Sequence, residues 1–276
     1  MDERLFLGLH AHLPHPTGGS GPSGGVTELR VPARLAEHVA QAAVYREDGI
    51  RAPIERVVPD AAVRLVFDLG TRRGAVDVAG PSAVPVLLRL GEATANLTVT
   101  LRPGAAGALL GIPASAIRDR CVPLEEIWPD AVEPLADRFA AAPDDPSCWQ
   151  IVRSVLEDRG ARERTVDRRR ARRAQRVLAA GGKVRDAAAA LGVGERRLQQ
   201  IFETEVGLSP REYRRLARLS SCLRSLRGQE RPRWSRLAAD HGFFDQAHLS
   251  NEFVAIVGLT PTELLECISG SSKTDR

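Results

Sequence analysis

Apolar positions change their spacing near the middle of the chain. From Thr27 to Gly111, short runs rich in Val and Leu alternate with Pro, Gly and Asp, as in VRLVFDLG (63–70) and NLTVTL (96–101). Such runs predict β-strands. Beyond residue 166 the apolar residues recur every three or four positions, which is the period of an α-helix. We therefore expect two folded modules of different class.

The first module is predicted to combine strands with helices. Residues 34–47 contain a helical stripe, formed by Leu35, Val39, Ala42 and Ala43. Further helices are predicted over three segments: 104–113, 123–142 and 145–160. The expected fold is an α+β domain whose core is a small β barrel or sandwich.

A pentapeptide occurs twice in the second module, as VGLSP (206–210) and VGLTP (257–261). Its Gly suits the left-handed residue that ends a helix. The Ser or Thr suits the N-cap of the next helix, and the Pro suits its first position. A Glu three residues after the cap completes a capping box. The sequence therefore predicts the same helix junction twice, with its acidic partners at Glu212 and Glu263.

The duplication extends upstream, because residues 183–207 align with residues 232–258. In each copy a small residue precedes a turn glycine by four positions: Ala188 before Gly192, and Ala238 before Gly242. A small residue lets a second helix cross closely, and the glycine turns the chain between the helices. This is the pattern of a helix-turn-helix unit. The second module is therefore predicted to be an all-α domain with two helix-turn-helix motifs.

The segment between the two units, PREYRRLARLSSCLRSLRG, is predicted to be a single amphipathic helix. Roughly 18 helical residues span about 27 Å. A rod of this length would hold two helices near the ~34 Å repeat of double-stranded DNA, one in each of two successive major grooves.

Charge divides along the same boundary. Residues 1–160 carry 16 Lys and Arg against 21 Asp and Glu, whereas residues 161–276 carry 23 against 14. A basic module attached to an acidic one is typical of proteins that bind a polyanion, although a solvated basic face explains the charge equally well.

Composition and boundaries complete the domain prediction. The four cysteines are scattered without metal-ligand spacing, which favours reduced thiols in a cytoplasmic protein. No run approaches the roughly 20 apolar residues of a membrane span. We expect a flexible tail (1–26), an α+β sensory or dimerisation domain (27–158), a linker (159–166), the helical domain (167–268) and a second tail (269–276).

Residues 166–268 resemble the DNA-binding domain of the AraC/XylS family of bacterial transcriptional regulators. The resemblance rests on LQQIF, VGLSPREYRRLARL, LAADHGFFDQAHLSNEF and VGLTPTEL. The upstream part is similar to a poorly characterised module that is found attached to such domains. The resemblance implies a sequence-specific DNA-binding transcription factor controlled by its N-terminal domain. Its implied partners are double-stranded DNA and RNA polymerase, with an unknown small-molecule effector and a homodimer left open.

The resemblance also implies which residues meet DNA. The first recognition helix would be Glu195 to Glu205, and the second would run from Asp245 to Ile256. Gln can pair with adenine and Arg with guanine in the major groove. The implied base contacts are Arg196, Gln199, Gln200, Gln246, Ala247, His248 and Asn251. The implied phosphate contacts are Lys183, Arg185, Arg197 and Arg214.

The second recognition helix departs from the family pattern. Asn251 stands where an Arg is usual, and Val254 stands where a Lys is common. These exchanges predict that the second helix makes weaker base contacts or mainly backbone contacts. For an effector, Asp60 and Arg64 are the candidate residues, with ordinary turn capping by Asp60 as the alternative.

The alternative functions are a barrel enzyme and a protein-interaction adaptor with a helical docking module. Between residues 28 and 140 the only histidine is His38, so metal chemistry lacks ligands. No G-x-S-x-G, phosphate-binding loop or dinucleotide fingerprint occurs. We therefore expect no catalytic residue, cofactor or metal. The basic helical module disfavours the adaptor.

Overall fold

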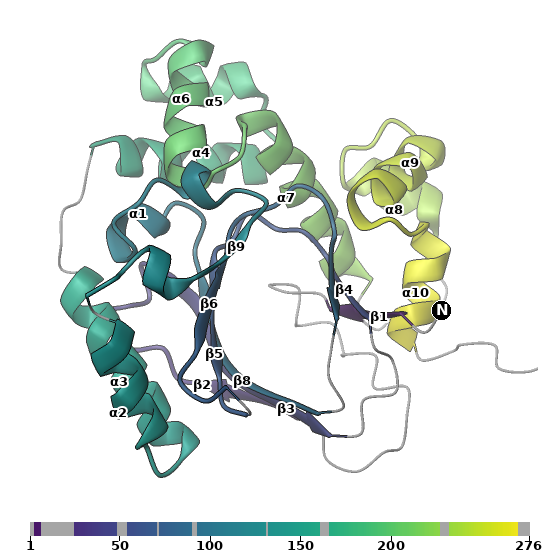
Figure 1. Ribbon diagram of the computed structural model, residues 1–276. Helices are drawn as coiled ribbons and strands as arrows, with labels where there is room; N and C mark the ends of the chain where they lie inside the picture. Colours follow the sequence, from purple (N-terminus) through teal and green to yellow (C-terminus); the bar gives the residue numbers. More distant parts are fainter. Residues whose placement is uncertain are drawn as a thin grey trace, which may run out of the picture.

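The structure, a computed structural model, describes residues 3–6, 25–48, 54–70, 72–89, 93–130, 132–160, 166–226 and 232–269. Among these residues, strands, three α-helices and two 3-10 helices form an N-terminal α+β part, and helices α4 to α10 form the C-terminal part (Figure 1). Within the described ranges, no helix has the length and apolar character needed to cross a membrane.

A six-stranded sheet forms the centre of the N-terminal part. Its strand order is β2-β3-β8-β5-β6-β9, and all of its pairings are antiparallel. Burial alternates along β5 and β6, as the pleat requires when one face is covered. The strands are β2 (Gly25–Leu29), β3 (Val39–Asp48), β5 (Arg64–Asp68), β6 (Val76–Ala79), β8 (Ala93–Leu101) and β9 (Cys121–Pro123).

Of the two cores expected, a small barrel or a sandwich, the closed barrel is not present among the described residues. The larger sheet is open, since its edge strands β2 and β9 do not pair with each other. A separate three-stranded sheet has the order β1-β4-β7, built from β1 (Glu3–Phe6), β4 (Ile54–Val57) and β7 (Val86–Arg89). The strand β1 pairs in parallel with β4, although it lies in the segment expected as a flexible tail. Residues 7–24 of that segment lie outside the described residues.

The helix predicted over residues 34–47 is wrong. Residues 33–38 form turns, and the strand β3 begins at Val39. Ala42 and Val44 face the core, whereas Ala43 and Tyr45 are only partly buried, which is a strand period after an irregular first step. Alanines fit both periods, so pairing with β8 along the length of β3 decides the outcome.

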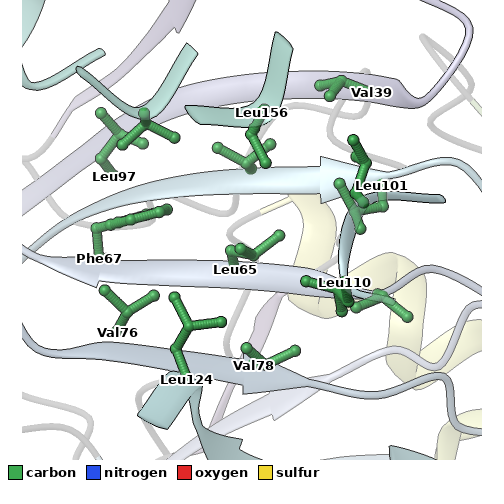
Figure 2. Close-up of a cluster of buried hydrophobic side chains, with 14 of the residues drawn as sticks. Val39, Leu65, Phe67, Val76, Val78, Leu97, Leu101, Leu110, Leu124 and Leu156 are labelled. Atoms are coloured by element: carbon green, nitrogen blue, oxygen red, sulfur yellow. The ribbon is translucent and has the colours of Figure 1, made fainter. Parts of the chain in front are cut away.

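Helices cover one face of the larger sheet and complete its core. Figure 2 shows Leu156 of α3 and Leu110 packed over Leu65, Leu97 and Leu101 of the sheet. The helix predicted over 145–160 is confirmed as α3 (Asp145–Gly160). The segments 104–113 and 123–142 are only partly helical. The first contains α1 (Ala106–Leu109), and the second contains the 3-10 helix η3 (Leu124–Glu126) and α2 (Val132–Ala140). A further 3-10 helix, η2 (Ala114–Ile117), lies between the two segments.

The C-terminal part is all-α, as predicted. Figure 1 shows α5–α6 and α8–α9 as two lobes joined by α7. Its core contains Leu198, Phe202, Leu249 and Phe253, all completely buried. The helices are α4 (Val166–Ala179), α5 (Val184–Leu191), α6 (Glu195–Val206), α7 (Pro210–Ser225), α8 (Trp234–Asp240), α9 (Gln246–Val257) and α10 (Pro261–Ser269).

Candidate nucleic-acid interface

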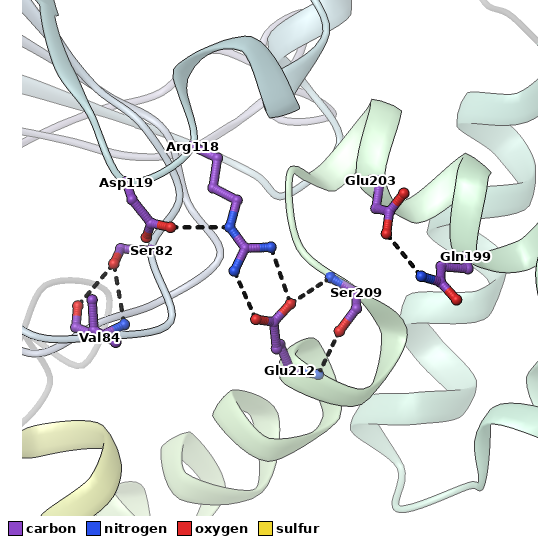
Figure 3. A network of polar contacts seen from close by, with 8 residues as sticks. All are labelled: Ser82, Val84, Arg118, Asp119, Gln199, Glu203, Ser209 and Glu212. Carbon is purple, nitrogen blue, oxygen red and sulfur yellow. Dashed lines mark hydrogen bonds and ion pairs between the residues drawn. The ribbon is translucent and has the colours of Figure 1, made fainter.

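The two copies of the pentapeptide form the same helix junction. Gly207 and Gly258 end α6 and α9 in the left-handed region, with φ of 82° and 78°. The Ser209 hydroxyl accepts from the Glu212 backbone N–H at 3.2 Å, and the Glu212 carboxylate accepts from the Ser209 N–H at 2.8 Å (Figure 3). The second junction repeats this exchange at 3.3 Å and 2.7 Å, between Thr260 and Glu263. Both predicted capping boxes are confirmed.

Each junction is preceded by a helix-turn-helix unit. Gly192 ends α5 with a φ of 64°, and Gly242 takes a φ of 70° in the turn after α8. The small residues Ala188 and Ala238 are buried where the helices cross. The turn is longer in the second unit, because α6 begins at Glu195 after Gly192, whereas α9 begins at Gln246 after Gly242. Since the apolar sides of α6 and α9 fill the core, their opposite sides face outward.

The outer face of α6 presents the three residues predicted to contact bases. Arg196, Gln199 and Gln200 are all exposed. The Gln199 amide donates to the Glu203 carboxylate at 2.9 Å (Figure 3), and the Gln200 side-chain oxygen accepts from Arg197 at 3.5 Å. These residues therefore lie on one accessible surface, where the two glutamines have partners within the same helix.

On α9 the predicted residues differ in exposure. Gln246, Ala247 and Asn251 are exposed, whereas His248 is half-buried. The His248 Nδ1 accepts from the Phe244 backbone N–H at 3.1 Å, so the neutral ring carries its proton on Nε2. His248 thus has one ring nitrogen available to a ligand as a donor.

Phe244 is a surface residue that the sequence did not single out. It lies directly before Asp245, the N-cap of α9, and its relative exposure is 92%. Its neighbour Phe243 is buried, with an exposure of 5%. In a Phe-Phe pair at a turn, one ring can enter the core while the other remains in solvent. The pair itself was the only signal available in the sequence.

The four predicted phosphate contacts are not equally available. Lys183 and Arg185 are exposed beside α5, whereas Arg214 is half-buried on α7. Arg197 is 2.6 Å from the Asp167 carboxylate, an ion pair that ties α6 to α4. The structure thus gives Arg197 a structural partner that the sequence did not predict.

The second recognition helix is held against α7 by one carboxylate. Glu252 accepts from Arg215 at 3.0 Å and from Arg218 at 3.2 Å, and Arg218 also stacks 4.4 Å from the centre of the Phe243 ring. Burial alone would raise the pKa of Glu252, but the two guanidinium groups outweigh it and hold that pKa below its ordinary value. The cluster therefore fixes α9 while leaving its outer face exposed.

The two candidate effector residues lie elsewhere. Asp60 is 5% exposed and forms an ion pair with Arg64, and its Oδ1 accepts from the Ala62 N–H at 3.0 Å. This arrangement stabilises the turn after β4, which is the alternative role given to Asp60 above. The effector assignment itself stays a prediction.

A groove of about 570 Å³ runs between the two domains. Glu28, Gln41 and Arg102 line it from the N-terminal domain, and Gln175 and Tyr213 line it from the helices. Burial raises the pKa of Tyr213 to about 12, so its hydroxyl stays protonated. Among the described residues, no group of three or more His, Cys, Asp or Glu side chains is placed to hold a metal ion.

The fold and the surface together define a DNA-binding module with two helix-turn-helix units. Residues 187–266 match the family model described as "Helix-turn-helix domain", and residues 27–123 match "Domain of unknown function (DUF6597)". The chain is an AraC-type DNA-binding transcription regulator with that N-terminal domain in front. The predicted family and DNA-binding function are confirmed.

Several solved structures of ToxT from Vibrio cholerae are similar to the chain. A structure at 1.65 Å resolution has 13% identity and a TM-score of 0.44, covering 82% of this chain and 98% of that one. Another, of ToxT with a bound unsaturated fatty acid, has 13% identity and a TM-score of 0.41, covering 88% and 99%. No curated protein matches the chain.

Proposed function

We propose that α6 and α9 enter two successive major grooves on one face of double-stranded DNA. The observation that carries this proposal is the exposure of the outer faces of both helices, while their apolar faces fill one shared core. The helix between the units, α7, has 16 residues and is therefore about 24 Å long. With the added width of the two units, this length suits the ~34 Å repeat of the double helix.

Within this surface, α6 would supply most of the base contacts. Arg196 can donate twice to guanine, and Gln199 and Gln200 can each pair with adenine. The second helix offers Gln246, Ala247, His248 and Asn251, together with the exposed Phe244 ring, which suits the methyl group of thymine. Because α9 lacks an Arg on this face, we expect it to discriminate less between bases.

Phosphate contacts would set the position of the protein without selecting sequence. Lys183 and Arg185 flank the start of α5, and Arg197 and Arg214 lie on α6 and α7. Arg197 can make such a contact while keeping Asp167, since a guanidinium group has five donors.

Control by the N-terminal domain is the second part of the proposal. A small molecule in the groove between the domains would touch both Arg102 and Gln175, and would thereby couple the two domains. Screening metabolites for one that raises the melting temperature of the protein tests this proposal. A ligand that still raises the melting temperature of the Gln175→Trp variant would contradict binding in this groove. RNA polymerase and a second copy of the chain are the further partners we propose.

We also propose that the chain acts by binding and carries out no catalysis of its own. We expect it to act in the cytoplasm, where bacterial DNA lies.

The N-terminal domain contacts the helices through ion pairs between Arg172 and Glu37 and between Arg118 and Glu212. Such contacts suit transmission of a signal from one domain to the other.

Selection of bound genomic fragments, followed by a salt titration on the enriched site, tests the DNA-binding proposal. Four phosphate contacts predict that log K falls with log salt at a slope of about −3 to −4. An adaptor would enrich no sequence and would show little salt dependence. A variant with Arg196, Gln199 and Gln200 all replaced by Ala should lose the enrichment and keep most of the slope.

A further inference from the structure

The N-terminal domain contacts the two helix-turn-helix units at equivalent points, namely the glycines that end the recognition helices. A Cβ atom added at Gly207 would lie 2.5 Å from Pro81 Cγ and 3.0 Å from the Ala114 carbonyl oxygen. One added at Gly258 would lie 2.5 Å from Arg56 Nη1 and 3.9 Å from Pro85 Cγ. Both ends of the segment 81–85 thus pack against the repeated junction.

Two neighbouring segments of the N-terminal domain also enter the core of the helical domain. We call residues 58–62 and 80–85 the bridging loops. Val58 is completely buried and Ala61 is 6% exposed, and both belong to the apolar cluster of the helices. Ala83 packs against the same cluster. The bridging loops are therefore part of the packing that surrounds α6 and α9.

The bridging loops are held together by hydrogen bonds. The Ser82 N–H donates to the Asp60 carbonyl at 3.4 Å, and the Ser82 hydroxyl donates to the Val84 carbonyl at 2.8 Å (Figure 3). The buried Asp60–Arg64 ion pair and the bond from Ala62 to Asp60 fix the first loop. Asp60 thereby helps to set the shape of the first loop.

The second bridging loop is anchored to the segment that leads into β9. The Gly80 N–H donates to the Arg120 carbonyl at 2.8 Å, and the Asp119 N–H donates to the Pro81 carbonyl at 3.1 Å. A side chain at Gly80 would overlap the Ile117 carbonyl oxygen, at 1.7 Å. Position 80 therefore requires glycine, and this close approach leaves the second loop little freedom to move relative to the sheet.

Polar contacts reinforce each of the two attachments. On the first unit, Arg118 donates to both oxygens of Glu212, at 3.2 Å and 2.7 Å (Figure 3). On the second, Arg56 donates to the carbonyl of Val257 at 3.3 Å. Each unit thus receives one apolar and one polar contact beside its junction.

We propose that the bridging loops and Arg56 set the separation and relative orientation of α6 and α9, and thereby the half-site spacing that the chain accepts. Contacts at the C-terminal ends of α6 and α9 restrict the motion of one helix-turn-helix unit relative to the other, which α7 alone would allow. Such preorganisation lowers the free-energy cost of binding two grooves at once. This inference rests on the proposed function, because spacing matters only if both helices bind one DNA.

The first test is a spacing series on DNA. Full-length protein is titrated with duplexes whose two half-sites are moved apart in steps of one base pair. Wild type should show one optimum, with affinity falling about tenfold two base pairs away, or ~1.4 kcal/mol. Arg56→Ala/Pro85→Ala should flatten this profile to within about threefold. The matched control is Arg72→Ala/Pro129→Ala, which removes the same side-chain types from exposed sites and should keep the wild-type profile.

The second test measures the geometry without DNA. Spin labels at the exposed positions Thr204 and Ala255, with Cys121 and Cys267 replaced by Ser, report the distance between α6 and α9. Wild type should give a narrow distribution, and Arg56→Ala/Pro85→Ala a broad one. If the double variant does not fold, as judged by circular dichroism, Arg56→Gln replaces it.

The two tests separate the inference from the function on which it rests. An unchanged distance distribution and an unchanged spacing profile in the variant would overturn the inference. A broadened distribution in a protein whose wild type binds no DNA site would support the role of the loops and overturn the proposed function instead.

Discussion

Side chains on the outer faces of α6 and α9 have partners within the protein. Gln199 is bonded to Glu203 in its own helix, and His248 accepts from the backbone of Phe244. A base edge must replace the Gln199 bond or share the amide, which has two donors. Such local bonds restrict the rotamers of the side chain and reduce the entropy that binding would cost.

Replacing Gln199 by Ala should relax base choice at one position of the site, at a cost of about 1–3 kcal/mol. The comparison is Lys183→Ala, which should weaken binding to all sequences alike and reduce the salt slope by about 1. Both outcomes are measured by selection from a randomised duplex at two salt concentrations. An unchanged sequence preference in Gln199→Ala would contradict its assignment.

Glu252 makes the attachment of α9 sensitive to acid. Its folded pKa lies below the ordinary 4.5, so its contribution to stability is complete above that value and is lost as the pH falls below it. We expect Glu252→Gln to reduce the free energy of unfolding by about 1–2 kcal/mol at pH 7. The difference between variant and wild type should shrink toward pH 3, in urea titrations at both pH values. A constant difference would show that the carboxylate charge is unimportant.

At the scale of single residues, the sequence predicted which side chains are exposed better than it predicted their partners. The exposed positions on α6 followed from helical period alone. The partner of Arg197 could not be predicted, because Asp167 is 30 positions away and lies on a different helix. Asp60 was predicted as a turn cap or an effector contact, and only the fold reveals that it forms an ion pair with the partly buried Arg64.

The helix junctions are the elements in which sequence and structure agree most closely. Local chemistry specifies them, since the glycine, cap, Pro and Glu all act within five residues of one another. The incorrect prediction of a helix over 34–47 has a non-local cause. Its alanines suit either period, and the pairing partner β8 lies about 50 residues away in the sequence, beyond any local pattern.

The two capping boxes should contribute similar amounts. Ser209→Ala and Thr260→Ala should each destabilise the fold by about 1 kcal/mol, because each leaves a helix N–H group without its acceptor. Urea unfolding followed by circular dichroism measures both. Thr204→Ala, at an exposed position within α6, is the control. A negligible loss in both variants would mean that other contacts alone hold the junctions.

At the scale of the whole molecule, ion pairs join the domains. Glu212 serves twice, since it closes the capping box of α7 and accepts from Arg118 of the N-terminal domain. The sequence predicted the first role from spacing. The second depends on how the domains pack, as does the contact of α4 with the N-terminal domain through Arg172 and Glu37, and neither has a local signature.

This double role gives a graded prediction. Arg118→Ala should cost about 1 kcal/mol, since it removes a partly exposed ion pair and leaves the cap intact. Glu212→Ala should cost about 2 kcal/mol, because the cap is lost as well. Equal losses in the two variants, measured by urea unfolding, would contradict the assignment of two separate roles.

Hydroxyl-radical footprinting of the full-length protein on its selected site tests the central claim most directly. If α6 and α9 are held at a fixed separation, they should protect two patches on the same face of the DNA, with centres about 10 base pairs apart. A single protected patch, or two patches on opposite faces of the duplex, would contradict the account.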